Sequence, residues 1–168
     1  MTTITTTPVT ASARTELPAP HADTLVALHD REHPACFACG QSSDGGLGLV
    51  FTVSPDTQTV TAEWCAPAWA ISYAGTVHGG LIATVLDSAM VHALFARGCE
   101  ARTASLTIRY RHPVRTASVC AVNARLLHTR APLFQLEATL HQDGHLCASA
   151  SAIFMRSPAT HPTSDPRS

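Results

Sequence analysis

The chain has 168 residues, of which 45% are hydrophobic and 14% are charged, and its formal net charge is −1. This length predicts a single domain with one core, and the small share of charged residues indicates that much of the surface is buried, in part against a second copy of the chain. Eleven Lys and Arg residues against twelve Asp and Glu exclude a general electrostatic binder of nucleic acid or anionic membranes.

The two ends differ in composition from the rest. Residues 1–20 are rich in Thr, Ala and Pro, and residues 157–168 are polar and Pro-rich. We expect both to be flexible tails flanking one domain over 21–156, because they bury too little apolar surface to offset ordering. No secretory signal or membrane span is expected. Six dispersed cysteines form no small disulfide framework, which favours a reduced, cytoplasmic protein.

The first half of the domain predicts a short helix and a hairpin. Asp23 is a candidate N-cap, and the residues after it read as a helix that ends near Pro34. Residues 50–54 and 58–65 are rich in β-forming residues and are separated by a turn. A stretch containing Pro, Trp and Gly follows over 66–80, without a predicted strand or helix.

Residues 81–96 predict the main helix. They carry a single formal charge, Asp87, and Gly98 lies just past their end. The segment is apolar on every side, so the helix should be buried nearly all round.

Four strand-like segments follow this helix. Residues 103–111 alternate between apolar and polar, which predicts one inward face, and Asp143-Gly144 is a strong hairpin signal. Four consecutive strands can form an antiparallel meander that curls round the helix, so we expect an α+β fold with a sheet wrapped about one central helix. The segments are 102–112, 117–129, 133–142 and 145–156.

Asp87 stands out because a carboxylate buried alone in an apolar helix is energetically costly. Two interpretations remain open. The side chain lies on a solvent-facing edge or is neutralised by a neighbour such as Arg109, or it is a catalytic carboxylate in a cleft.

The start of the helix favours the catalytic interpretation. Gly79 and Gly80 follow His78, and free N–H groups at such a start can bind an anion or oxyanion. The alternatives are a tight turn for the glycines and a structural role for His78. An oxyanion-capable helix start and a carboxylate in the same helix together indicate acyl-transfer chemistry.

The spacing of these groups has a consequence. Gly79 and Asp87 are eight residues apart, or about 12 Å along a helix, so one carbonyl carbon cannot lie within about 3 Å of both on the same chain. Either one group alone acts, or Asp87 of one subunit acts with Gly79 of another. We favour the shared site, which makes dimerisation a requirement of function.

The HGG-x6-D pattern resembles the hotdog-fold acyl-CoA thioesterases, with CFACG…GLGLVF before it and TASLTIRYRHP after it. Within the 4-hydroxybenzoyl-CoA thioesterase superfamily, the PaaI-type branch is most similar. The resemblance covers roughly residues 36–155. It implies a long helix wrapped by an antiparallel sheet, dimers joined by a continuous sheet, and in some members tetramers.

The resemblance also implies roles for four residues. The Gly79 N–H polarises the thioester carbonyl, and Asp87 is a general base or a nucleophile. His78 positions the thioester or shapes the pocket, and Thr103 orients water or the carboxylate.

Coenzyme A contacts are implied near Gly80 and at two arginines. Many members of the family read Tyr-x-Arg-Pro after the strand, whereas this chain has His112 before Pro113, with Arg111 and Arg115 on either side. Arginines suit the nucleotide phosphates. A solvated strand edge is the alternative for either one.

No metal site is predicted. His33, Cys36 and Cys39 have the spacing of half a zinc site, but no second motif supplies a fourth ligand, for which His29 and Cys65 are the candidates in the sequence. Asp87 and His92 are similar to the pair of hotdog hydratases, but five residues place them about 140° apart round a helix.

The sequence therefore predicts hydrolysis of an acyl-CoA thioester to a free acid and coenzyme A, with no cofactor required. We expect a homodimer, with a homotetramer left open, and no nucleic-acid partner or membrane insertion. The alternatives are a non-catalytic acyl-CoA-binding hotdog protein and a hotdog enoyl-CoA hydratase. Apolar helix residues, among them Ala89, Met90, Ala93 and Phe95, are expected to line the acyl pocket.

Overall fold

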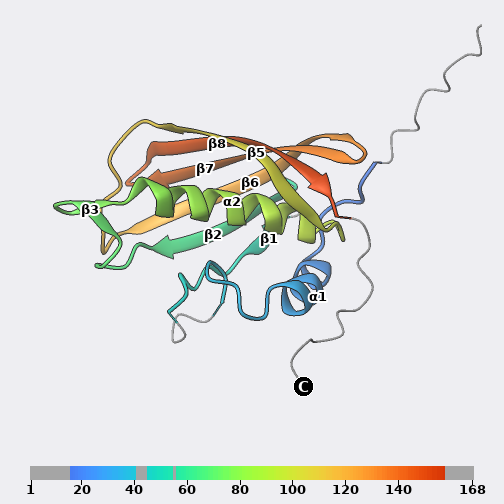
Figure 1. Ribbon diagram of the computed structural model, residues 1–168, viewed down its shortest axis with the longest axis horizontal. Coiled ribbons are helices and arrows are strands. Elements are labelled where there is room, and N and C mark those ends of the chain that lie inside the picture. Colours follow the sequence, from blue (N-terminus) through green and yellow to red (C-terminus); the bar gives the residue numbers. More distant parts are fainter. Residues whose placement is uncertain (1–15, 41–44, 55, 158–168) are drawn as a thin grey trace, which may run out of the picture.

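The computed structural model describes residues 16–40, 45–54 and 56–157. A curved antiparallel sheet packs against one long helix, α2, as Figure 1 shows. The predicted α+β architecture, a sheet wrapped about a central helix, is therefore confirmed. The predicted tails at 1–15 and 158–168 lie outside the described residues.

Helix α2 spans Gly79–Phe95 and begins two residues earlier than predicted. Gly79 and Gly80 thus form its first turn rather than the turn before it. Its end agrees with the prediction: Gly98 has a φ of 68°, and beyond it the Cys99 N–H donates to Leu94 O at 3.0 Å. Glycine adopts this left-handed conformation without steric cost and so ends the helix.

The core lies between α2 and the inner face of the sheet. Leu86 and Met90 of the helix are fully buried, as are Phe134 and Phe154 of the sheet. The predicted burial of the helix is confirmed along its length after the first turn.

The main sheet has six strands in the order β1-β2-β6-β7-β8-β5, all antiparallel. The bounds are β1 (Thr52–Ser54), β2 (Thr59–Cys65), β5 (Ala101–Tyr110), β6 (Val119–Arg130), β7 (Leu133–Gln142) and β8 (His145–Arg156). Both predicted hairpins are confirmed, and Asp143 and Gly144 both have positive φ.

The expected four-strand meander is wrong in one respect. Only β6, β7 and β8 form a meander, because β5 pairs with β8 at one edge while β6 pairs with β2. The connection from Arg111 to Ser118 carries the chain from the edge strand β5 past β8 and β7 to β6. The Gln142 side chain holds this connection, because it accepts a hydrogen bond from the Arg115 N–H and donates one to the Arg115 carbonyl. Strands on both sides of the meander thus extend the cover over α2.

The predicted inward face of β5 is only partly formed. Leu106 and Ile108 are half-buried, whereas Ala104 and Tyr110 are exposed. The register of β5 against β8 shifts between Thr103 and Ser105, which marks a bulge at Ala104. A bulge takes one residue out of the alternation and redirects its neighbours.

Two short strands, β3 (Ile71–Tyr73) and β4 (Thr76–Val77), form a hairpin that was not predicted. Gly75, with a φ of 71°, makes its turn. The hairpin leads directly into α2, and the Val77 N–H donates to Val114 O at 2.8 Å. These contacts fix the point at which the helix starts.

Helix α1 (Ala22–Glu32) lies beside the C-terminal end of α2, opposite the β3–β4 hairpin in Figure 1. Its N-cap is His21 rather than the predicted Asp23, which sits in the first turn. The His21 N–H donates to Ala96 O at 2.8 Å, and the Arg97 side chain donates to Pro18 O at 2.6 Å. Residues 16–20 are thereby attached to the end of α2.

All six cysteines lie within the described ranges and are free. No helix among the described residues is both long and apolar enough to cross a membrane.

Candidate active site

Asp87 lies in the middle of α2 and faces a cavity of about 390 Å³ beside the helix. The carboxylate is half-buried. The cavity is bounded by the end of α1, by α2 and by the start of β5. Its lining residues are Glu32, His33, Asp87, Val91, Phe95, Glu100, Ala101, Arg102, Thr103 and Ser157.

Thr103 contacts Asp87 directly. Its hydroxyl donates a hydrogen bond to Asp87 Oδ1 at 2.8 Å, although the residues are sixteen positions apart. Thr103 immediately precedes the bulge in β5. Because the hydroxyl is a neutral donor, it orients the carboxylate without cancelling its charge.

Burial raises the pKa of the Asp87 carboxyl above its ordinary value, and the hydrogen bond from Thr103 partly opposes this shift. No ion pair involves Asp87 among the described residues, so the neutralisation by Arg109 considered from the sequence does not occur there. Apart from its contact with Thr103, the carboxylate therefore faces the cavity. A desolvated carboxylate in this setting is a stronger base than one in water.

The start of α2 carries the second candidate group. Nδ1 of His78, the N-cap residue, accepts a hydrogen bond from the Gly80 N–H at 2.9 Å. The Tyr110 hydroxyl donates to Gly79 O at 2.8 Å. The Gly79 N–H donates no hydrogen bond among the described residues, because a first-turn amide has no acceptor within its own helix.

His78 therefore has a helix-capping contact, and it also holds the Gly80 amide that the resemblance assigned to coenzyme A. The Gly79 N–H remains as the amide that can donate to a ligand oxygen. Since α2 is continuous from Gly79 to Asp87, these two groups are about 12 Å apart within one chain. The fold does not bring them together in a single chain.

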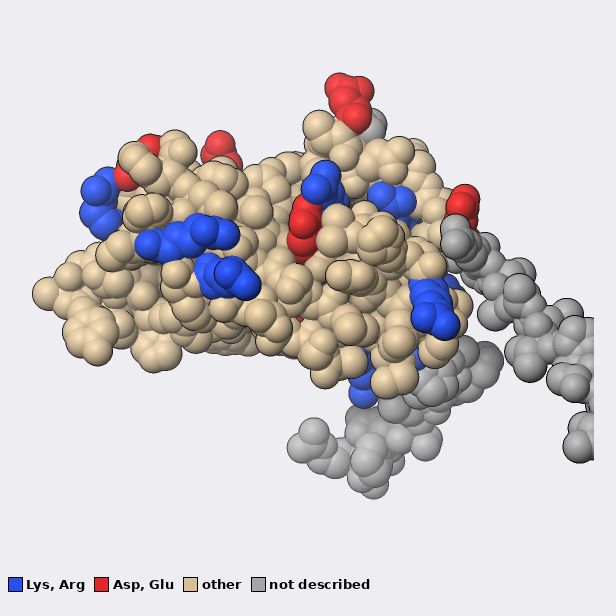
Figure 2. All heavy atoms as spheres, turned by 90° about the horizontal axis from the view of Figure 1, so that it is seen from above, with Lys and Arg blue, Asp and Glu red and all other residues tan. Residues whose placement is uncertain are grey.

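The two arginines linked to coenzyme A by the resemblance are both exposed, and neither lines the Asp87 cavity. The Arg115 guanidinium pairs with Asp143 in the β7–β8 turn. Its backbone forms an isolated bridge with Thr76, close to the start of α2. Figure 2 shows several basic side chains close together on one part of this face, and others apart from them.

Several residues of the cavity wall were not found from the sequence. Arg102 and His33 line it, and nothing in their spacing indicates that they would meet Asp87. Ala89, Met90 and Ala93, which were expected to line an acyl pocket, are buried in the core and do not line the Asp87 cavity. Val91 and Phe95 of α2, on the same side of the helix as Asp87, do line it, as does Ala101 of β5.

His92 is buried, with 1% of its surface exposed, and it does not line the cavity of Asp87. The structure thus separates the two residues that resembled a hydratase pair, as the helical spacing predicted. His33 belongs to a cluster of histidine and cysteine side chains whose ligand-forming atoms lie within 4.8 Å of one another.

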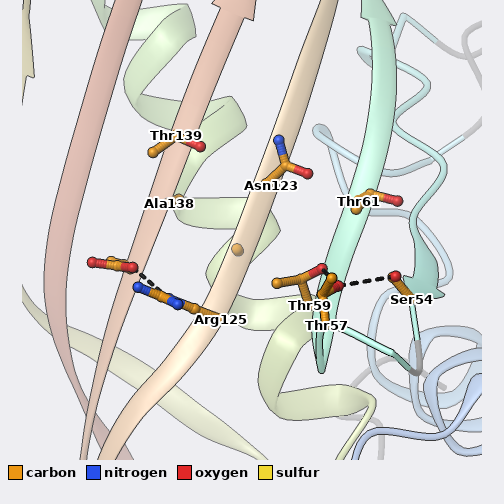
Figure 3. Close-up of a pocket in the computed structure, with 10 residues that line it drawn as sticks. Ser54, Thr57, Thr59, Thr61, Asn123, Arg125, Ala138 and Thr139 are labelled. Carbon is orange, nitrogen blue, oxygen red and sulfur yellow. Dashed lines mark hydrogen bonds and ion pairs between the residues drawn. The ribbon is translucent and has the colours of Figure 1, made fainter. Parts of the chain in front are cut away.

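A second groove of about 440 Å³ lies on the outer face of the sheet, with α2 behind the strands, as Figure 3 shows. Thr61, Asn123 and Thr139 contribute polar side chains to it. Its one carboxylate, Glu137, is paired with Arg125. This groove offers no uncompensated base or nucleophile, so the chemistry favours the Asp87 cavity.

Residues 74–148 match the family model described as the Thioesterase superfamily. This region contains the helix start, Asp87 and Thr103. No curated protein matches the chain by sequence.

Solved structures extend the likeness to most of the chain. The PaaI protein of the Escherichia coli phenylacetic acid degradation operon has a TM-score of 0.69 at 14% identity, covering 83% of this chain and 97% of that one. A thioesterase-like, phenylacetic acid degradation-related protein of Ralstonia eutropha has a TM-score of 0.64 at 24% identity, covering 79% and 98%. A Streptococcus mutans protein solved with acetyl-CoA has a TM-score of 0.59 at 18% identity, covering 65% and 86%.

The fold and the matched region together define a hotdog-fold protein with a carboxylate-containing cavity beside its central helix. Within this class the fold implied by the resemblance is confirmed: residues 74–148 match the Thioesterase superfamily model, and the chain has the fold of the PaaI protein and its structural relatives.

Proposed function

We propose that this protein hydrolyses acyl-CoA thioesters, releasing a carboxylic acid and coenzyme A. The observation that carries the proposal is the Asp87 carboxylate. It is half-buried, it accepts a hydrogen bond only from the neutral Thr103 hydroxyl among the described residues, and it faces a cavity. A structural carboxylate would be expected to have a cationic partner.

The reaction needs no group beyond the chain, the thioester and water. Asp87 accepts a proton from water as the water oxygen attacks the thioester carbonyl carbon. The carbonyl oxygen becomes an oxyanion, and the Gly79 N–H donates to it. When the oxyanion collapses, the C–S bond breaks and the coenzyme A thiolate takes up the proton. Direct attack by Asp87, followed by hydrolysis of the resulting anhydride, has the same overall balance.

A second copy of the chain would complete this site. One carbonyl cannot contact both Gly79 and Asp87 of one helix, because about 12 Å separates them. Strand β5 ends the sheet, and its outer edge has no strand partner among the described residues. Tyr73, 81% exposed, and Trp69, 60% exposed, lie near the helix start and add apolar surface for a partner. We propose a homodimer in which Asp87 of one copy acts with Gly79 of the other.

Coenzyme A fits the rim of such a site. The Streptococcus mutans neighbour was solved with acetyl-CoA. In this chain, Arg111 is exposed near the end of β5 and Arg115 lies near the start of α2. Their guanidinium groups would contact the nucleotide phosphates.

The test is a panel of aryl-, short- and medium-chain acyl-CoAs, with release of the free thiol as the measurement. We expect turnover with at least one class of acyl group. Binding of acyl-CoAs without thiol release would contradict hydrolysis and identify a binding protein. Loss of enoyl-CoA absorbance without thiol release would identify a hydratase.

A further inference from the structure

A group of five histidine and cysteine side chains lies where α1 meets α2, and thioester hydrolysis does not use it. Two sets of three residues have ligand-forming atoms within 4.8 Å of one another, and they share Cys39. One set is His33, Cys36 and Cys39, and the other is His29, Cys39 and His92. Imidazole nitrogen and thiolate sulfur are the donors that zinc prefers.

The first set comes from the loop that follows α1. The Gly40 N–H donates to Cys36 O at 2.7 Å, and this turn brings Cys36 and Cys39 to the same side. A Cβ at Gly40 would lie 2.5 Å from Cys36 O, so the turn requires glycine. His33 Nδ1 lies 3.4 Å from Cys39 Sγ. Three donors are thus held together by local sequence.

His92 supplies an independent observation. It comes from α2 and is 1% exposed, and its Nε2 has no hydrogen-bond partner within residues 16–40, 45–54 and 56–157. Its Nδ1 lies 2.7 Å from Ser88 O, and because a carbonyl only accepts, Nδ1 carries the proton and Nε2 carries a lone pair. A buried nitrogen is rarely left without a partner. A ring whose other N–H donates to a backbone carbonyl is the usual arrangement of a metal-ligating histidine.

We propose that a zinc ion binds in this cluster, with His33, Cys36 and Cys39 as three ligands and His92 as the fourth. His92 shares a set with Cys39 but not with His33 and Cys36, so its ring would close on those two ligands when zinc binds. His92 is preferred to His29 as the fourth ligand because its Nε2 is buried without a partner among the described residues, whereas His29 is only half-buried and can reach water. Four protein ligands make a closed, structural site. The expectation of no metal rested on a missing fourth ligand in the sequence, and the fold places His92 near Cys39 although the two are far apart along the chain.

Such a site would join the end of α1 to the central helix. His33 also lines the Asp87 cavity, so the zinc ion would fix one wall of that cavity while remaining outside the reaction. Metal binding that requires the folded arrangement adds its free energy to stability. The proposal does not depend on the thioesterase activity.

The decisive experiment is metal analysis of the full chain, purified without a histidine tag under reducing conditions from zinc-supplemented cells. We expect one zinc ion per chain, and a lower melting temperature after chelation that added zinc restores. Replacement by Co²⁺ should give the sulfur-to-cobalt charge-transfer band and the d–d bands of a tetrahedral site. Protein that holds no zinc and gives no such spectrum would overturn the proposal.

Variants then test the ligand set. Cys36→Ser and His92→Ala should each lose most of the bound zinc, whereas Cys65→Ser, at an exposed cysteine in β2, should retain it. His29→Ala should also retain it. Loss of zinc from His29→Ala with retention in His92→Ala would overturn the assignment of His92. The wild-type measurement stays decisive even if a variant fails to fold.

Discussion

Asp87 is the residue at which stability and activity oppose one another. Burial raises its carboxyl pKa, so the folded chain binds a proton more tightly than the unfolded chain does. In the pH range between the unfolded and the folded pKa, stability therefore falls as the pH rises, and the loss is complete above the folded pKa. The carboxylate is present in the apolar helix despite the cost of burying its ionised form. Strained or desolvated groups of this kind are characteristic of functional sites.

Replacing the carboxylate should separate these two effects. Asp87→Asn keeps the shape and can still accept the Thr103 hydrogen bond, but it removes the base. We expect thioester hydrolysis to fall by about 10²–10⁴-fold. The melting temperature at neutral pH should equal or exceed that of the wild type, because a desolvated charge is gone. Near-normal turnover in the variant would refute the role of Asp87.

We propose Thr103 as a positioning residue, and its effect should appear in the pH profile of the reaction. Its hydrogen bond lowers the Asp87 pKa against the larger effect of burial, so Thr103→Val should raise that pKa further. The proposed mechanism uses the ionised form of Asp87, so the acid limb of kcat/KM should move to higher pH. Thr107→Val, at an exposed threonine of the same strand, is the matched control and should leave the limb in place. If the acid limb of kcat/KM lies at the same pH in Thr103→Val and Thr107→Val, the proposed role of Thr103 is contradicted.

At the scale of elements, α2 positions both of the groups that we propose to react. Its first turn presents the Gly79 N–H, and its middle presents Asp87. The β3–β4 hairpin, the His78 cap and the Tyr110 hydroxyl all fix where the helix begins. The amide is therefore held in place before a ligand arrives, which is what stabilisation of an oxyanion requires.

The first helical position allows this amide to be removed without breaking the helix. Proline is well tolerated there, and His78, with φ −62° and ψ 130°, has a backbone conformation allowed before proline. Gly79→Pro should lower kcat by about 10²–10³-fold. Gly79→Ala keeps the N–H and adds a Cβ that is 3.4 Å from the Tyr110 ring. The decrease in kcat should therefore be much smaller for Gly79→Ala than for Gly79→Pro. Circular dichroism would verify that both variants fold, and equal kcat values would contradict the oxyanion role.

At the scale of the whole molecule, the proposed shared site divides its two groups between two copies of the chain. Strand β5 provides Thr103 and also ends the sheet, so the strand that borders Asp87 is the one with a free edge. Pairing of that edge with a second copy would place another α2 near the first. Activity should then be lost on dilution to a monomer, and an active monomer would contradict the shared site.

Mixing two inactive variants tests this arrangement directly. In a heterodimer of Gly79→Pro and Asp87→Asn, one site carries both changes and the other carries neither. Random subunit exchange should therefore restore about a quarter of the wild-type activity. Thiol release before and after exchange is the measurement. If each chain holds a complete site, mixing restores nothing.

The sequence alone determined the elements whose signals are local. The apolar run around Asp87 predicted a buried helix, Gly98 predicted its end, and Asp143-Gly144 predicted the β7–β8 hairpin. It also singled out Asp87, because an isolated charge in an apolar helix has few explanations. The contact of Thr103 with Asp87 agrees with what the family resemblance implied, although the role of Thr103 is still a proposal.

Only the tertiary structure decided which distant residues meet. The pairing of β5 with β8, the place of Arg102 and His33 in the cavity wall, and the approach of His92 to Cys39 have no signal in spacing. Helix periods and turn residues report the preferences of a short stretch of backbone. Contacts between elements follow instead from how the sheet and the two helices together bury their apolar faces.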